Sequence, residues 1–580
     1  MDMDMDMDMD MDMDMDMDMD IMKNNKFRID AACRVYTATL LIMLLMLPLF
    51  AKAQTYNIQQ NNGFDPLSRV LYRPAVNLHS AIKPYRLDQI NQYYSTDSLI
   101  QRGIGKPNKK MHLLRRFVHD DFLKWSDSDI TVRINPLFNF ELGRQSANGK
   151  NTWVNTRGVM IEGQLGKNFS FYGDVYENQA VFPDYLTEYI AKKQVVPGQS
   201  RIKNYGEGGY DFSLANGYVS YNAGRWINLQ LGFGKNFIGD GYRSLLLSDN
   251  TPSYAHLKMT ATFWKVKYWW MIAQFQELND LDTRVGDDRF NYKYGAFHFL
   301  DWNIGKRFTF GIFESVIWAN EDESGYRGLD INYMVPFLFY RPVEFGLGSP
   351  DNMVIGVNAK FITWKNAALY GQIILNEFKL DEILARNGWW ANKQGYQIGF
   401  KAYDFLNIKN LDVQTEYSQV RPFTYSHYSS ITNYGHFNQE LAHPLGANFR
   451  ENISILRYRW KRWHLELKSM IAVHGEDKNV EETRDLGATE SRTWIISYGG
   501  DIFRSNLDRY GSHNHWIGQG LRTNILNWSG EISWLVNPKT NMNIAVGGQY
   551  RTCQNEQTNS ARVLLFVTLR TSLRNFYYDF

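Results

Sequence analysis

Three stretches of the chain gather side chains that could bind a ligand. The first starts at residue 237, reads FIGDGYRSLLLSDN and contains Asp240 and Arg243. The second starts at residue 341, reads RPVEFGLGSPDN and spaces Arg341 and Glu344 by three positions. The third, residues 421–448, is the richest and reads RPFTYSHYSSITNYGHFNQELAHPLGAN. Its candidate side chains are Arg421, Tyr425, His427, Tyr434, His436 and His443.

These residue types suit the recognition of a saccharide. Aromatic faces pack against the apolar faces of sugar rings, and amides, guanidinium groups and carboxylates form hydrogen bonds with hydroxyls. A structural alternative stays open, because folded loops and barrel interiors also need arginine–carboxylate networks to satisfy buried polar groups. The candidate saccharide contacts are Asp240, Arg243, Arg341, Glu344, Arg421, Tyr425, His427, Tyr434 and His436.

Catalytic motifs are absent from the sequence. It contains no HExxH, no GxSxG and no Walker loop, and Gly232-Phe233-Gly234 lacks the third glycine of a dinucleotide site. His513 and His515 are two positions apart, but two ligands without a third do not make a metal site. We therefore expect a non-enzymatic protein without a metal or cofactor.

Composition favours one large membrane-associated β domain. Among 580 residues, 44% are hydrophobic and 15% aromatic, and the mean hydropathy is −0.42, as for a barrel with a lipid-facing band and a polar interior. The 63 basic and 61 acidic residues leave a net charge of +2, which gives no basic footprint for nucleic acid. Only Cys553 follows the signal peptide described below, so we expect no intramolecular disulfide.

From Ile130 onward, apolar residues recur with the period of two that is typical of strands. In residues 169–176, for example, Phe169, Phe171 and Val175 share one face. Residues 307–319 are apolar on one face except at Glu314. We expect further strands at residues 130–145, 153–165 and 260–274.

Such strands in series predict an all-β fold, an outer-membrane antiparallel β-barrel of about 16 to 18 strands spanning residues 126–580. Its apolar face would contact outer-membrane lipid. The expected outer loops are 178–209 with a helix at 183–193, 278–289, 380–393, 421–447 and 475–492. Aromatic residues near strand ends would form the interfacial girdles, among them Trp389, Trp390, Trp460 and Trp463.

The part of the chain before residue 126 divides into three segments. Residues 1–21 are a low-complexity Met-Asp run, which we interpret as a translated repeat ahead of the true start at Met22. Residues 22–53 read as a secretory signal peptide, with a basic start, an apolar core and an Ala-Lys-Ala cleavage site. Residues 54–125 are predicted to form a helical plug or periplasmic segment, or a spacer under the barrel rim, with helices at 87–94 and 109–125.

The C-terminal stretch, residues 561–580, reads ARVLLFVTLRTSLRNFYYDF. Its alternation predicts the closing strand of the barrel, with Phe576, Tyr578 and Phe580 on one face and Asp579 on the other. The aromatic end resembles the signal that the bacterial barrel-assembly machinery reads, so we expect that machinery to be a partner.

The three stretches carry a family resemblance. The first, which follows Gly232-Phe233-Gly234-Lys235, resembles the Gly-rich motif of the Wzi capsule-assembly family. The second and third are similar to the RPVE and RPYTYSH stretches of its gliding-motility RemB-like members. The resemblance spans most of the mature chain. It implies an outer-membrane barrel with a helical plug that binds capsular polysaccharide at the cell surface.

Three functions compete at this point. The first is a surface protein that binds or organises cell-surface polysaccharide and serves capsule assembly, gliding or adhesion. The second is a porin or plugged transporter for small solutes, for which a long N-terminal preface has little use. The third is an outer-membrane hydrolase, which would need a serine or carboxylate constellation that the sequence lacks.

Overall fold

The fold was analysed in a computed structural model of the chain. It describes residues 57–58, 68–74, 76, 78–95, 117–146, 148–278, 290–322, 325–336, 339–348, 351–364, 366–478, 481–485, 491–571 and 576–580. The predicted Met-Asp run and signal peptide lie outside these residues, as do residues 109–116 of the helix predicted at 109–125. Among the described residues, no helix is both long and apolar enough to cross a membrane.

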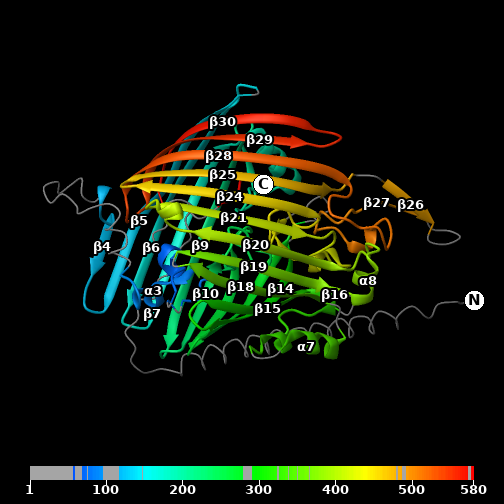
Figure 1. Cartoon of the computed structure of the whole chain (residues 1–580), viewed down its shortest axis with the longest axis horizontal. Coiled ribbons are helices and arrows are strands. Elements are labelled where there is room, and N and C mark those ends of the chain that lie inside the picture. Colours follow the sequence, from blue (N-terminus) through cyan, green and yellow to red (C-terminus); the bar gives the residue numbers. More distant parts are fainter. Residues whose placement is uncertain are drawn as a thin grey trace, which may run out of the picture. The chain divides into compact units, whose positions relative to one another are not determined.

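Eighteen antiparallel strands form a closed barrel, which confirms the predicted fold class (Figure 1). Closure comes from β30 pairing with β5, where Phe566 lies opposite Gly143. The strands are β5 (Ile130–Gln145), β6 (Asn151–Leu165), β7 (Phe169–Val181), β9 (Gly209–Ala223), β10 (Ile227–Gly234), β12 (Tyr254–Phe263), β13 (Val266–Glu277), β14 (Asn291–Ile304), β15 (Phe308–Ala319), β18 (Asn352–Trp364), β19 (Ala367–Glu377), β20 (Lys393–Ala402), β21 (Leu411–Val420), β24 (Phe449–Trp460), β25 (Trp463–Glu476), β28 (Leu521–Asn537), β29 (Met542–Gln554) and β30 (Asn559–Arg570).

The outer face of this barrel is apolar and exposed. Val563, Leu565 and Val567 of β30 point outward, whereas Thr568, the residue after Val567, is buried inside the barrel. The same alternation holds in β7, where Val175 is exposed and Asp174 is buried. An apolar outward band around a closed sheet is the arrangement that a transmembrane barrel requires.

One predicted strand is in fact a hairpin. Residues 260–274 were expected to form a single strand, but Trp264 and Lys265 form a two-residue turn between β12 and β13, where Phe263 pairs with Val266. Trp264 adopts a φ of 54°, a left-handed conformation that glycine or asparagine usually supplies in such turns. Within β13, Val266, Tyr268, Trp270 and Ile272 share one face.

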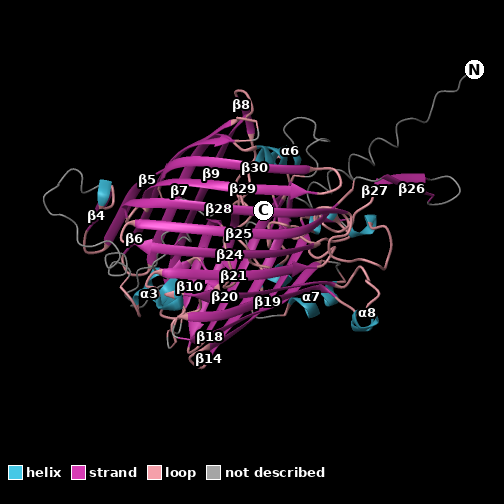
Figure 2. Ribbon diagram, turned by 45° about the horizontal axis from the view of Figure 1, so that its top comes forward, coloured by secondary structure: helices cyan, strands magenta, loops and turns pink. Residues whose placement is uncertain are grey.

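Short turns join the strands at one end of the barrel and long loops join them at the other, which is the expected asymmetry of outer-membrane barrels (Figure 2). The helix expected at 183–193 is confirmed as α6. Outside the barrel wall, the structure contains α6 (Asp184–Lys193), β8 (Lys203–Tyr205), β11 (Phe237–Ile238), β16 (Glu321–Asp322), β17 (Gly325–Tyr326), η1 (Ile331–Met334), α7 (Tyr340–Leu347), α8 (Leu380–Ala385), η2 (Phe405–Asn407), η3 (Ser430–Thr432), β22 (Gly435–His436), β23 (Gln439–Glu440), β26 (Glu481–Asp485), β27 (Ser491–Ile495) and η4 (Asn506–Asp508).

Part of the N-terminal segment packs against the barrel wall at its short-turn end. Arg69 forms ion pairs with Asp404 and Asp412 on the wall, at 2.9 and 2.6 Å. His79 lies 2.8 Å from the carboxylate of Asp301 on β14. Its elements are β1 (Asn57–Ile58), α2 (Ser68–Leu71), β2 (Ile82–Lys83), β3 (Tyr85–Arg86), α3 (Leu87–Asn91) and β4 (Leu123–Ser126).

Of the two helices predicted in the N-terminal segment, one is confirmed and the other is partly wrong. The short helix predicted at 87–94 is confirmed as α3. The helix predicted at 109–125 is wrong at its end, because Leu123–Ser126 form β4, which pairs with β5. The apolar spacing of three and four there gives way to the hydrogen bonds that an edge strand gains from the adjacent sheet.

The lumen is filled by a packed apolar core. Inward-facing Trp269, Phe297 and Phe313 on the wall pack in one cluster with residues of the loops 237–250 and 421–448. Members contributed by these loops include Ile238, Leu245, Leu246, Leu247, Tyr425, Tyr434, Leu441 and Leu445. The barrel therefore resembles a globular domain inside and does not enclose a wide aqueous channel through this region.

The prediction for the end of the chain needs a correction. The closing strand ends at Arg570, and residues 576–580 form no strand. Instead they lie in the lumen, where Tyr577 and Phe580 are buried in the core and the C label of Figures 1 and 2 stands among the strands. Tyr185 of α6 donates a hydrogen bond to the carbonyl of Tyr578 at 2.7 Å. The alternation of aromatics there serves interior packing.

Candidate functional site

Wall residues hold the glycine-rich loop 237–250 in the lumen. Glu416 on β21 accepts hydrogen bonds from the backbone N–H groups of Tyr242 and Arg243, both at 2.8 Å. Gln372 on β19 accepts from the N–H of Leu245 at 2.8 Å. Because a Cβ on Gly239 would lie 2.5 Å from the Gln372 amide, only glycine lets the loop approach the wall so closely.

Asp240 joins this loop to the N-terminal segment. Its carboxylate accepts hydrogen bonds from Tyr72 at 2.9 Å and Ser80 at 2.5 Å, and from Asn358 on the wall at 3.2 Å. Burial raises the pKa of the Asp240 carboxyl, but nearby Lys360 and the Ser80 hydroxyl outweigh burial and hold that pKa below its ordinary value. Asp240, a predicted saccharide contact, is therefore a buried, ionised residue that links the glycine-rich loop to the N-terminal segment.

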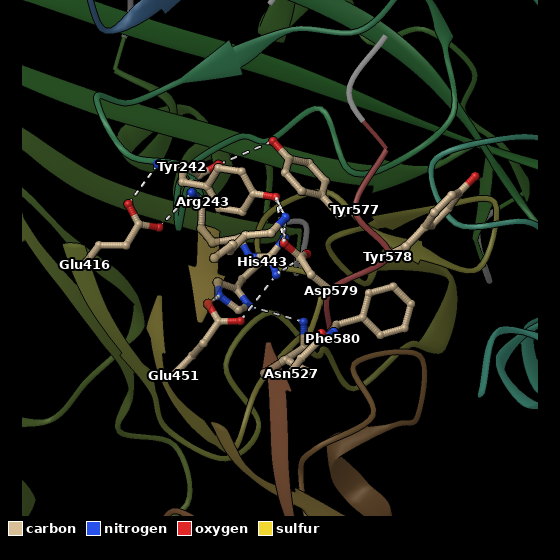
Figure 3. A network of polar contacts seen from close by, with 12 residues as sticks. Tyr242, Arg243, Glu416, His443, Glu451, Asn527, Tyr577, Tyr578, Asp579 and Phe580 are labelled. Atoms are coloured by element: carbon tan, nitrogen blue, oxygen red, sulfur yellow. Dashed lines mark hydrogen bonds and ion pairs between the residues drawn. The ribbon is translucent and has the colours of Figure 1, made fainter. Parts of the chain in front are cut away.

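Arg243 is fully buried in a charged network with the last residues of the chain (Figure 3). Its guanidinium lies 2.9 Å from Asp579 and 3.4 Å from Glu451. Asp579 also pairs with Lys468 at 2.7 Å, and His443 lies 2.7 Å from Glu451. The network fixes residues 576–580 against the glycine-rich loop.

The aromatic residues of the third stretch serve the same packing. The hydroxyls of Tyr425 and Tyr434 donate hydrogen bonds to the carbonyls of Leu245 and Leu246, each at 2.7 Å. His436 and His427 are buried, and burial lowers their pKa values to about 3 and about 4. Six predicted residues are thus buried and not displayed at the surface: Asp240, Arg243, Tyr425, His427, Tyr434 and His436.

Arg341 and Glu344 lie elsewhere. They form an ion pair of 2.8 Å on α7, where Arg341 is mostly exposed. Helix α7 packs on the outside of the barrel beside β15, so this pair joins neither the lumenal network nor the loops.

Arg421 is the predicted residue that connects the long loops at one end of the barrel. Its guanidinium donates hydrogen bonds to three backbone carbonyls, those of Asn392 at 2.8 Å and of Trp389 and His515 at 3.2 Å. It thereby ties the loop before β20 to the loop before β28. The same two loops are joined by backbone hydrogen bonds, for example from Trp390 to Ser512 at 3.0 Å.

The joined loops present an aromatic and polar surface, which we call the loop surface and define by Trp389, Trp390, Tyr510, His513 and Trp516. Trp516 is 50% exposed, and the guanidinium of Arg421 lies 5.9 Å from its ring centroid. The guanidinium of Arg509 stacks 4.0 Å from the ring of Trp390.

Sequence reasoning assigned parts of this surface to other roles. Trp389 and Trp390 were expected in an interfacial girdle, whereas Trp460 and Trp463 do lie exposed at a strand turn as predicted. His513 and His515 do not converge, because His513 is exposed near Glu382 and His515 is buried against Gly511. The sequence prediction missed Trp516, the residue after His515, which is exposed on the loop surface.

The lumen also keeps a cavity of about 300 Å³, lined by both polar and apolar residues, on the side of β28 to β30 and β5 to β7. Glu141, Glu466 and Arg570 are among the charged residues that line it. Phe576 and Tyr578 of the C-terminal segment line it as well, together with Tyr185 of α6.

Comparisons with known proteins add fold-level likeness. No protein-family model and no curated protein matches the chain. The solved structures it resembles are outer-membrane barrels. Wzi of Escherichia coli, described as a carbohydrate-binding β-barrel involved in group 1 capsule assembly, is 12% identical, with 90% of this chain and 100% of that chain covered and a TM-score of 0.49. OprD of Pseudomonas aeruginosa is 9% identical over 76% of this chain and 96% of its own, with a TM-score of 0.38. OpdK of the same organism, solved with vanillate, is 8% identical over 76% of this chain and 98% of its own, with a TM-score of 0.40. At these identities and scores the likeness bears on the fold alone.

Proposed function

We propose that the protein is a non-enzymatic, closed outer-membrane barrel that binds or organises cell-surface polysaccharide through its loop surface. The observation that carries this proposal is the contrast between a lumen packed with apolar side chains and a loop end that displays aromatic rings beside guanidinium and amide groups. A packed lumen does not favour solute flow, and an exposed indole ring beside hydrogen-bonding groups suits the face of a sugar ring.

The loop surface has the chemistry that sugars require. Trp516 offers a flat apolar face for the C–H groups of a pyranose ring. Exposed Ser512, His513 and Asn514 lie next to it in the chain and supply hydrogen-bonding groups for hydroxyls. Arg421 acts as a positioning residue beneath them, because all three of its hydrogen bonds go to backbone carbonyls of the two loops.

The finer assignments belong to the same proposal. A bound capsular or surface polysaccharide would place the protein in capsule organisation, or in the surface adhesion that gliding needs. Insertion would use the bacterial barrel-assembly machinery, for which we propose β30 as the recognised strand, because residues 576–580 are occupied inside the finished barrel.

The test is binding of the purified protein to surface polysaccharide from its own cells, measured by biolayer interferometry. Trp516→Ala should weaken binding about fivefold, because one stacking contact contributes about 1 kcal/mol. The matched control is Leu507→Ala, an exposed residue 59% accessible nearby, which should leave affinity unchanged. Equal binding by both variants would remove the loop surface from the proposal.

A porin or plugged transporter is the competing function, and the 300 Å³ cavity is the feature that favours it. Steady single-channel conductance of the intact protein in planar bilayers would support that alternative and contradict the closed-barrel proposal.

A further inference from the structure

The outward face of β14 and β15 contains two polar side chains at membrane depth. His298 and Glu314 are register partners, and both lie in the outward alternation, since Phe297 and Phe313 next to them are in the lumenal core. An ionisable side chain on the lipid face of a barrel is destabilising. Yet both residues are buried. Something other than lipid must therefore cover them.

The cover is the connection between β15 and β18. We call its described residues 327–336 and 339–348 the wall arm; it includes η1 and α7 and lies on the outside of the barrel (Figure 1). The ring of Tyr340 lies 4.0 Å from the ring of His298. The N–H groups of Tyr340 and Arg341, at the start of α7, donate to Glu314 at 3.0 and 3.2 Å. The helix start thus satisfies one oxygen of the carboxylate, Oε1.

Packing extends this contact along the wall. Trp318 of β15 points outward but is fully buried, and its indole N–H donates to the carbonyl of Gly328 at 3.0 Å. Tyr333 packs on Trp318 with ring centroids 5.0 Å apart. A second apolar cluster, separate from the lumenal core, joins the arm to the wall through Trp270, Ile272, Val316, Trp318, Tyr333, Tyr340 and Met353.

The opposite face of the arm is exposed and mainly apolar, and its polar members are Asn332 and Arg341, of which Arg341 forms an ion pair with Glu344. Phe345 is 86% accessible and Phe339 is 74% accessible. Ile331, Val335 and Leu347 are exposed as well. Monomeric soluble surfaces rarely present such a set in one short segment.

The height of the arm places this face in the hydrocarbon region. Trp302 is exposed at the short-turn end of β14, where an interfacial girdle is expected, and His298 is four residues further along the strand. Four residues of strand rise about 13 Å, which is less than the apolar band of about 25 Å. Exposed Leu300, Ile312 and Ile355 continue the apolar surface around the arm.

We propose that the wall arm is embedded in the bilayer, with Phe339 and Phe345 among the acyl chains and its inner face sealing His298 and Glu314 from lipid. The occupant of the exposed face is lipid because that face is continuous with the outward band of the barrel. This inference is independent of saccharide binding, since the arm shares no residue with the loop surface.

The test is electron paramagnetic resonance of nitroxide labels in liposomes, with Cys33→Ser and Cys553→Ser as background. The label is placed at Phe345→Cys. Ile398→Cys, on the outward face of β20, is the lipid reference, and Leu507→Cys, in an outer loop, is the water reference. Substitution of such exposed residues should leave folding intact, which heat-dependent migration on gels confirms.

We expect oxygen to relax the Phe345 label more than a water-soluble nickel complex does, as at Ile398. Stronger relaxation by nickel, as at Leu507, would place the arm in water and overturn the proposal. Shielding from both reagents would indicate a protein partner or a second copy, and would overturn it equally.

Discussion

The carboxylate of Asp579 lies 2.9 Å from the guanidinium of Arg243, across 336 positions of sequence. This contact joins the segment after the closing strand to the glycine-rich loop, and both partners are buried in the lumen. Lys468 and Tyr242 hold the other carboxylate oxygen, each at 2.7 Å. Ion pairs inside the lumen therefore hold the C-terminal segment 576–580 and the glycine-rich loop together.

Removing the acid from this network should be costly. Asp579→Asn leaves Arg243 and Lys468 with one carboxylate fewer, and breaking a buried pair typically costs about 3 to 5 kcal/mol. We expect a lower unfolding midpoint in urea titrations of the detergent-solubilised protein. Asp381→Asn, at an exposed position of α8, should change stability by less than about 0.5 kcal/mol. Equal midpoints for the two variants would contradict a structural role for the network.

Excising the loop 421–448 should open the barrel. Asn448 donates to the carbonyl of Arg421 at 3.3 Å, so an Asn-Gly turn can replace residues 422–447 without straining β21 or β24. We expect the intact protein to be closed in planar bilayers and the excised variant to conduct. The control shortens the hairpin of β26 and β27, which extends away from the barrel (Figure 2). A folded but closed excision variant would show that the other plug segments suffice.

Acid should loosen the loops. Burial holds the pKa of His427 and of His515 near 4, below the ordinary 6.5. Each histidine is neutral when folded and binds a proton more readily when unfolded, so its stabilising contribution is complete above pH 6.5 and is lost as pH falls toward 4. Limited proteolysis should cut the loop 421–448 faster at pH 4.5 than at pH 7.5. The His427→Gln variant should show a smaller pH effect, and an unchanged pH profile would contradict this assignment.

Arg421→Lys should weaken the loop surface although the charge is kept. One ammonium group cannot reach three carbonyls that a planar guanidinium spans, and unsatisfied buried acceptors cost about 1 to 3 kcal/mol. We expect a lower melting temperature and weaker polysaccharide binding together. Arg450→Lys, on the exposed face of β24, is the control and should change neither. Retained binding by the Arg421 variant would mean that the loops do not depend on this arginine.

The barrel was predictable because period-two patterns report directly on a sheet with one apolar face. The predicted strand 130–145 and helix 183–193 agree with β5 and α6 to within one residue at each end. The hairpin within 260–274 was missed because Trp264 stands where a turn usually has glycine or asparagine. The end of the chain misled for another reason: any extended backbone alternates its side chains, whether or not a neighbouring strand pairs with it.

The candidate site was harder to place. Tyr425, Tyr434 and His436 have the composition of a sugar site, but amphipathic rings also suit a lumen where one edge is apolar and the other meets a carbonyl. Glu314 was the more informative residue. A single carboxylate in an apolar row is a local inconsistency, and its explanation lies in a helix from a different part of the chain.

The burial of Tyr577 and Asp579 has a consequence for the order of folding. Arg243 cannot meet its partner until β30 and the residues after it have left the ribosome and crossed to the membrane. Contacts so distant in sequence form late and slowly. The lumenal core would then pack only after the wall is nearly complete. The earlier strands would cross the periplasm with their lumen-facing apolar residues still exposed. This barrel should therefore depend on periplasmic chaperones more than a barrel with a water-filled lumen.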